Sequence, residues 1–155
     1  CLVHSFALAE NGEFFPVDEK KLKIEFVGDS ITSGEGLVGS INEEEWISTW
    51  ISPSKTYAVQ AANALNAEFS LISECGWGVV TGWDNNINLA IPPIYEKVCG
   101  SCKGKKQSEL GSLDFYDFSS NKKDFIFVNL GTNDANAFNT PPWKENENAP
   151  EYKMH

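Results

Sequence analysis

The sequence predicts an α/β fold, a three-layer α/β/α sandwich built around a mainly parallel sheet. Three short segments rich in apolar, β-branched and aromatic residues have the composition of strands, and a helical segment separates the first two. Strands that alternate with helices pair in parallel, because the helix carries the chain back before the next strand begins. The strands are expected at residues 22–27, 67–73 and 124–130. We therefore expect one α/β domain over residues 22–155, preceded by an N-terminal extension, linker or strand over residues 1–21.

The third expected strand is almost entirely apolar, as a strand buried on both faces of a sheet should be. It ends at Gly131, as the first strand ends at Gly28 and the second ends near Gly76. In open α/β sheets, ligands bind just outside the carboxyl ends of the strands. These three turns are therefore the first place to look for functional residues.

The helix between the first two strands is expected to begin near Ser52. That serine is a candidate N-cap, and Pro53 suits the first helical turn, where no N–H donor is needed. Apolar side chains then recur at helical spacing, which predicts one buried face. Its members are Tyr57, Ala58, Ala61, Ala62 and Leu65.

The remaining segments are less regular. A weaker helix is expected within residues 85–95, interrupted by the consecutive prolines Pro92 and Pro93. Residues 99–110 are small, polar and basic, which indicates an exposed loop. After Thr140 the chain is polar and carries no strand signal, so the sheet is expected to be incomplete at its C-terminal side.

Charge and hydropathy exclude several classes of partner. The formal net charge of −10 makes an electrostatic grip on nucleic acid or on an anionic membrane implausible. No apolar run reaches the ~20 residues that a membrane-spanning helix needs. We expect no nucleic-acid partner and no membrane span.

The four cysteines include one CxxC pair, Cys99 and Cys102, beside Cys1 and Cys75. CxxC spacing serves redox sites, zinc sites and short-loop disulfides. A zinc site would want four ligands, and neither a second CxxC nor paired histidines accompany this pair. We expect either a local disulfide or two free thiols in a surface loop, and no metal site.

Three polar groups are expected to converge at the carboxyl edge of the sheet. Ser30, after Gly28 and Asp29, would present its hydroxyl and its amide N–H at a helix start, although a serine there is also an ordinary N-cap. Gly76 would leave a backbone N–H accessible, or be a common loop glycine. Asn133 would offer a side-chain amide donor, worth roughly 3–4 kcal/mol to a developing oxyanion, or belong to a plain turn.

Taken together, these turns resemble the first three conserved blocks of the SGNH (GDSL-type) hydrolases. The nearer resemblance is to carbohydrate esterase family two, the acetyl esterases of plant polysaccharides. It runs from about residue 22 to residue 134 and rests on several stretches of sequence. These are IEFVGDSITSG (24–34), TYA (56–58), AEF (67–69), GWGV (76–79) and VNLGTND (128–134).

That resemblance implies an SGNH, flavodoxin-like fold and a secreted serine esterase that removes O-acetyl groups from acetylated polysaccharides or oligosaccharides without a cofactor. It implies that Ser30 is the nucleophile. It implies an oxyanion hole formed by the amides of Ser30 and Gly76 with the side chain of Asn133. Asp29 and Asp134 would then support the two loops. Of the five tryptophans, Trp77 and Trp83 are expected to line the substrate cleft.

The general base is not identified in this chain. The superfamily places a histidine in a late DxxH motif, which this sequence lacks, and only His4 and His155 are present. The histidine is therefore expected on a further C-terminal segment or on a second chain that completes the fold. Two alternatives stay open: an SGNH lipase or lysophospholipase, and a non-catalytic carbohydrate-binding module with a degenerate esterase site.

Overall fold

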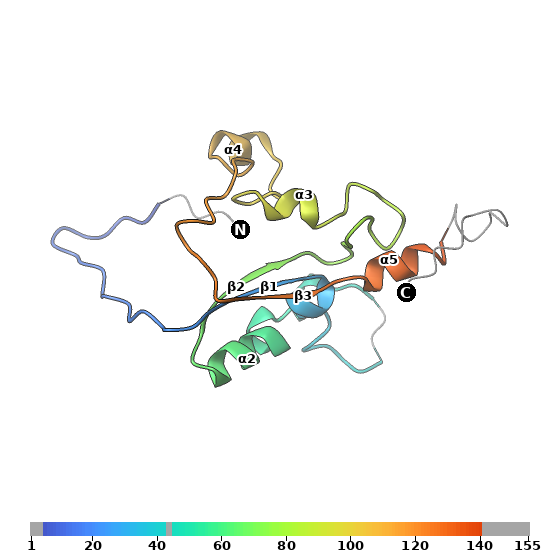
Figure 1. Cartoon of the computed structure of the whole chain (residues 1–155), viewed down its shortest axis with the longest axis horizontal. Coiled ribbons are helices and arrows are strands. Elements are labelled where there is room, and N and C mark those ends of the chain that lie inside the picture. The colour runs from blue at the N-terminus through green and yellow to red at the C-terminus, as the bar shows by residue number, and fades with distance from the viewer. Residues whose placement is uncertain (1–4, 43–44, 141–155) are drawn as a thin grey trace.

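The computed structural model describes residues 5–42 and 45–140, and these residues fold around a three-stranded parallel sheet (Figure 1). The strands lie in the order β2-β1-β3. Their bounds are Lys23–Gly28 for β1, Glu68–Ser73 for β2 and Phe125–Asn129 for β3. The α/β class, the parallel pairing and all three strand positions expected from the sequence are confirmed.

Helices cover the two faces of the sheet (Figure 1). One face carries α2 (Tyr57–Ala64), and the other carries α3 (Pro92–Tyr95) and the short α4 (Lys105–Glu109). Two further short helices follow strands at the carboxyl edge, and two 3₁₀ turns precede α2. These elements are α1 (Ser30–Ser33), α5 (Thr132–Ala137), η1 (Ser48–Trp50) and η2 (Pro53–Lys55).

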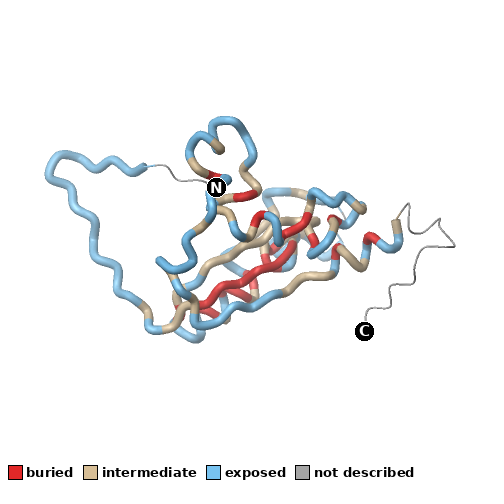
Figure 2. Tube along the Cα trace, turned by 45° about the horizontal axis from the view of Figure 1, so that its top comes forward, coloured by how far each residue is buried: buried red, intermediate tan, exposed pale blue. Residues whose placement is uncertain are grey.

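The core is divided by the central strand, because successive side chains of a strand point to opposite faces. Ile24 and Phe26 pack with buried alanines of α2, while Val27 packs on the other face with Ile91 and Ile94 beside α3. Figure 2 shows the buried residues running along β1, between less buried neighbouring strands. Burial of these apolar side chains is the main force that holds α2 and α3 to the sheet.

The start of α2 differs from the expectation. Ser52 makes no side-chain cap, because it precedes the separate turn η2 rather than the helix itself. The chain returns to an extended conformation at Thr56, whose hydroxyl oxygen accepts a hydrogen bond from the Val59 amide at 3.5 Å. Leu65 lies after the last helical residue and is 58% exposed, so it does not share the buried face.

Two further expectations about helices were wrong. Pro92 and Pro93 begin α3 instead of interrupting a longer helix, because the first helical positions need no N–H donor. Within residues 99–110, the exposed segment contains α4 rather than loop alone. Both helices are a single turn or little more, which falls below what hydrophobic periodicity can detect.

The third strand is exposed, although its composition predicted burial on both faces. Its four apolar residues are Phe125, Ile126, Phe127 and Val128, and between 50% and 62% of each is accessible to solvent. They alternate between the two faces, and the described residues cover each face of β3 only in part: Phe127 contacts the rings of Phe26 and Tyr57. The physical reason is position: β3 is the last strand in the order β2-β1-β3, and its outer edge has no strand partner in the described part of the chain.

The N-terminal segment forms neither helix nor strand over residues 5–22 and is mostly exposed. Lys20 ties its end to the domain by donating a hydrogen bond to the Ala67 carbonyl at 3.2 Å. None of the helices in the described ranges is long and apolar enough to cross a membrane.

Candidate active site

Parallel pairing places the ends of the three strands at one edge of the sheet. Gly28 of β1 pairs with Ser73 of β2 and with Asn129 of β3. The turns that follow these residues therefore start side by side. Ser30 begins α1 after β1, Gly76 lies in the turn after β2, and Asn133 lies in α5 after β3, so all three follow strand ends at this edge.

Ser30 is the first residue of α1, held there by the residues around it. Asp29 is 1% exposed, and its side chain accepts a hydrogen bond from the Ile31 amide at 3.0 Å, which caps the helix. Position 28 requires glycine, because a Cβ there would clash with the side chain of Thr32. At the first position of a helix, the Ser30 amide has no intrahelical acceptor and is available to a ligand.

Gly76 lies in the turn after β2 and needs to be glycine for two reasons. Its φ of +78° falls in the left-handed region, and an added Cβ would meet the Trp83 ring at 2.9 Å. On one side this turn is tied to α1, because the Ser33 hydroxyl donates to the Ser73 hydroxyl at 2.9 Å. The strand end that leads into the Gly76 turn is therefore linked to α1, which carries Ser30.

The other side of the Gly76 turn is tied to α5. Asn133 is 8% exposed, and its side-chain amide donates to the Trp77 carbonyl at 2.8 Å. An asparagine amide has two N–H donors, so one remains for a ligand.

Asp134, the next residue, accepts hydrogen bonds from three consecutive backbone amides. These belong to Val79, Val80 and Thr81, at 2.8, 2.7 and 3.2 Å. The Gly76 turn is thus held between α1 and α5, with Asp29 and Asp134 each fixing a loop through backbone N–H groups.

The chain is similar in sequence and fold to known proteins. An acetyl xylan esterase from the rumen bacterium Butyrivibrio proteoclasticus is 50% identical with a TM-score of 0.79, over 84% of this chain and 35% of that one. A family two carbohydrate esterase from Clostridium thermocellum in complex with cellohexaose is 26% identical with a TM-score of 0.66, over 78% of this chain and 34% of that one. An acetylxylan esterase / glucomannan deacetylase of Cellvibrio japonicus is 27% identical over 72% of this chain and 29% of its own length.

The chain is most like the family two carbohydrate esterases. The resemblance inferred from the motifs is thereby confirmed. The chain spans about a third of the length of these relatives. No protein-family model matches it.

Beside Ser30, the present chain has a cavity of 330 Å³ that was not predicted from the sequence. It lies between α1 and η1, and two tryptophans, Trp46 and Trp50, line it. The full lining is Ser30, Ile31, Glu35, Gly36, Glu45, Trp46, Ile47 and Trp50. Trp50 lies in η1, but the described residues around Trp46 form no helix or strand and show no hydrophobic periodicity. Only their nearness in sequence to Ser30 could have indicated that they line this cavity.

The two tryptophans expected in the cleft, Trp77 and Trp83, lie outside the cavity that contains Ser30. Trp77 packs against the buried cluster of Val27, Ile91 and Ile94, so much of its ring serves the core. Trp83 is 51% exposed and lies against Gly76, with its amide donating to the Gly76 carbonyl at 3.0 Å. Neither lines the cavity that contains Ser30.

Cys75, beside Gly76, has a potentially nucleophilic thiol, but its surroundings disfavour the reactive thiolate. Burial, followed by a hydrogen bond to the Glu35 carboxylate and that group's charge, raises the pKa of its thiol to about 11. At neutral pH the thiol therefore stays protonated, and the thiolate is the reactive form. This leaves Ser30 as the candidate nucleophile at this edge of the sheet.

The described ranges contain no histidine, since His4 and His155 both lie outside them. The histidine base that the family resemblance implies is therefore not among the described residues. Within those same residues, no group of three histidine, cysteine, aspartate or glutamate side chains is placed to hold a metal ion.

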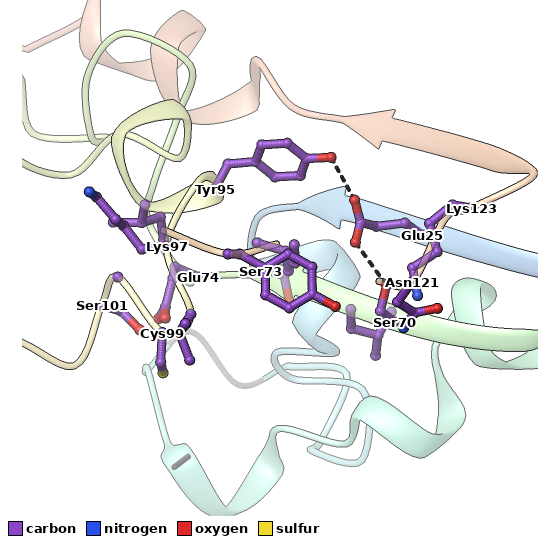
Figure 3. A pocket seen from close by; sticks show the side chains of 16 residues that line it. Glu25, Ser70, Ser73, Glu74, Tyr95, Lys97, Cys99, Ser101, Asn121 and Lys123 are labelled. Atoms are coloured by element: carbon purple, nitrogen blue, oxygen red, sulfur yellow. Dashed lines mark hydrogen bonds between the residues drawn. The ribbon is translucent and has the colours of Figure 1, made fainter. Parts of the chain in front are cut away.

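A second cavity, of 380 Å³, lies over the α3 face of the sheet and does not include Ser30 (Figure 3). Its floor carries Glu25, a carboxylate 4% exposed in the middle of β1. Glu25 accepts hydrogen bonds from the Tyr95 hydroxyl at 2.7 Å and the Ser70 hydroxyl at 2.9 Å. A buried carboxylate needs such donors, and these two connect α3 to β1 and β2.

Cys99 of the CxxC pair lines the same cavity. The Cys99 and Cys102 sulfurs lie 3.3 Å apart as free thiols, rather than at the ~2.05 Å of a disulfide. The fully buried Ser112 secures their loop by donating to the Cys102 carbonyl at 2.6 Å and accepting the Cys99 amide at 2.8 Å through its own carbonyl. Of the two expected states, the structure shows the free thiols.

The Tyr95–Glu25 hydrogen bond predicts a pH dependence of stability. Burial, and then the hydrogen bond to Glu25, raises the pKa of Tyr95 from 10.0 to about 12. The folded state holds this proton more tightly than the unfolded state, so the stabilisation is complete below pH 10 and is lost as the pH rises to about 12. Tyr95→Phe should therefore lower the free energy of unfolding below pH 10, with the difference from wild type shrinking toward pH 12. Urea unfolding of both proteins across this range would test it; a pH-independent difference would contradict it.

Proposed function

We propose that this chain carries the nucleophile and oxyanion hole of a secreted serine esterase that removes O-acetyl groups from plant cell-wall polysaccharides. The observation that carries the proposal is the convergence of Ser30, Gly76 and Asn133 at one sheet edge. Hydrogen bonds from both sides hold the Gly76 turn in that arrangement. The Butyrivibrio and Cellvibrio relatives, described as an acetyl xylan esterase and an acetylxylan esterase / glucomannan deacetylase, support the choice of substrate.

In this mechanism the Ser30 hydroxyl oxygen attacks the acetyl carbonyl carbon and gives its proton to the general base. The carbonyl oxygen becomes an oxyanion, to which the Ser30 and Gly76 amides and the free N–H of the Asn133 side chain donate. Collapse of this intermediate releases the sugar hydroxyl, which takes the proton back, and leaves an acetyl ester on Ser30. Water, deprotonated by the same base, then attacks that ester; the bond to the Ser30 oxygen breaks, this oxygen takes the proton back from the base, and acetate is released.

We further propose that a continuing segment covers β3 and brings the histidine. Four apolar residues of β3 are at least half exposed, on both faces of the strand, and its outer edge is unpaired in the described residues. An exposed, unpaired apolar edge is costly and prone to aggregation. The relatives are about three times as long as the part that this chain matches, which gives them the length for such a segment.

The test is the acyl preference of the longest natural polypeptide that contains this chain. We expect 4-nitrophenyl acetate to be hydrolysed about tenfold or more faster than the octanoate, and acetylated xylan to release acetate. Faster hydrolysis of the octanoate would indicate the lipase or lysophospholipase alternative. Polysaccharide binding without turnover of any ester would indicate the non-catalytic binding module.

A further inference from the structure

We infer that the cavity beside Ser30 is a subsite for a neutral sugar ring, with Trp46 as its stacking platform and Glu35 as its hydrogen-bond acceptor. This inference rests on the proposed function and names the residues that would select its substrate. Neither tryptophan expected from the sequence lines this cavity.

Trp46 is available for a ligand. Its side chain is 59% exposed although indole is among the largest apolar groups, and it lines the 330 Å³ cavity together with Ser30. The other tryptophan of this cavity, Trp50, is covered on one side by the backbone at Gly39. A Cβ added to Gly39 would lie 2.7 Å from the Trp50 ring. Trp46 also lines a neighbouring cavity of 480 Å³ that contains Ser33 and Cys75, and its indole N–H donates a hydrogen bond to the Cys75 sulfur, which holds the ring at this place.

Glu35 is fixed relative to the nucleophile. Its backbone amide donates to the Ser30 carbonyl at 3.0 Å, which places it at the end of α1 and in the same cavity. Its carboxylate accepts a hydrogen bond from the Cys75 thiol. A carboxylate has about four lone-pair positions, so acceptor capacity is left for hydroxyl groups of a ligand.

An exposed indole and a carboxylate in one small cavity have the chemistry that binds a sugar. The C–H groups on one face of a pyranose carry partial positive charge and are attracted to the negative face of an aromatic ring. The hydroxyls at the edge of the pyranose donate to carboxylate oxygens. A pyranose seated on Trp46 with a hydroxyl near Glu35 would present a neighbouring O-acetyl group toward Ser30.

Charge narrows the ligand to a neutral sugar. Glu35 and Glu45 line the Ser30 cavity and Glu74 lines the neighbouring one, while no lysine or arginine of the described ranges lines either. A uronic acid would bring a further carboxylate into this negative region, at a cost in affinity that falls with added salt. We therefore expect acetylated oligosaccharides without uronate side groups to be preferred.

The experiment compares two substrates in the longest natural polypeptide that contains this chain. Trp46→Ala should raise KM for acetylated xylo-oligosaccharides roughly tenfold, the loss of one stacking contact, because binding to the sugar is removed. Its kcat/KM for 4-nitrophenyl acetate, which has no sugar, should stay within about threefold. Trp46→Phe should recover part of the loss. Ile41→Ala, at a residue 99% exposed in the same region and outside the cavity, is the matched control and should change neither.

Glu35→Gln tests the charge argument separately. This change keeps the shape of the side chain and removes its charge, so discrimination against uronate-bearing oligosaccharides should decrease several-fold. An unchanged ratio of KM values for neutral and uronate-bearing substrates would overturn the assignment of selectivity to Glu35.

The remaining outcomes separate this inference from the proposed function. If 4-nitrophenyl acetate is hydrolysed but Trp46→Ala leaves the oligosaccharide KM unchanged, the subsite is wrong while the esterase stands. If Trp46→Ala lowers activity on both substrates equally, Trp46 is structural and the inference fails. If no ester is hydrolysed, the proposed function fails, and binding of xylo-oligosaccharide is then measured by calorimetry. Binding that Trp46→Ala abolishes would still support the subsite. Binding that Trp46→Ala leaves unchanged would overturn the subsite.

Discussion

Ser30→Ala is expected to reduce ester hydrolysis by a factor on the order of 10⁶ in kcat, to the level of the uncatalysed background. No acyl-enzyme can form without the hydroxyl, and the protonated Cys75 thiol nearby cannot replace it at neutral pH. The measurement is 4-nitrophenyl acetate hydrolysis by the longest natural polypeptide that contains this chain. Stability should change little, because the half-buried hydroxyl caps nothing: Asp29 provides the helix cap.

Ser33→Ala is the matched control for this prediction. It makes the same chemical change within the same helix, where the hydroxyl donates to Ser73 at 2.9 Å and lies outside the cavity of Ser30. We expect a partial loss of activity, far smaller than that of Ser30→Ala, because the bond to Ser73 positions the Gly76 turn but takes no part in the acyl transfer. Residual turnover in Ser30→Ala above about 1% of wild type would contradict the assignment of Ser30 as the nucleophile.

The carboxyl edge of the sheet could be predicted from sequence because strand and turn chemistry leave strong local signals. An apolar run that stops at Gly28 fixes where the chain leaves the sheet, and Gly131 does the same for β3. Parallel pairing then requires the turns to meet, whatever the detailed contacts. What the sequence could not provide was the hydrogen bond from Asn133 to the Trp77 carbonyl, since its partners are 56 residues apart.

Other features were missed because their causes are not local. Thr56 and Ser52 are equally good caps by residue type, and only the intervening turn η2 decides between them. Trp46 lies in no periodic pattern, so nothing in the sequence distinguishes an exposed aromatic from a buried one there. The apolar run of β3 predicts burial on both faces, but the described residues do not cover the strand fully. Phe127 is therefore half exposed.

Asn133→Ala is expected to lower kcat roughly 10²- to 10³-fold, the usual loss for one oxyanion-hole donor in an enzyme. KM for 4-nitrophenyl acetate should change much less, because the donor acts mainly on the charge that develops in the transition state. The same substitution removes the hydrogen bond to the Trp77 carbonyl, so some stability is lost as well, about 1 kcal/mol for a bond of this kind. Kinetics and urea unfolding must therefore be measured on the same protein.

Asn136→Ala separates the two effects of Asn133→Ala. Asn136 lies one turn later in α5, is exposed, and donates to the Trp83 carbonyl at 3.4 Å, so it also ties α5 to the loop after β2. If Asn133 only positions the loop, both substitutions should lower kcat in proportion to the stability that they cost. If Asn133 donates to the oxyanion, its loss in kcat should far exceed that of Asn136→Ala, because only Asn133 has a buried amide with a second N–H beside the Gly76 turn.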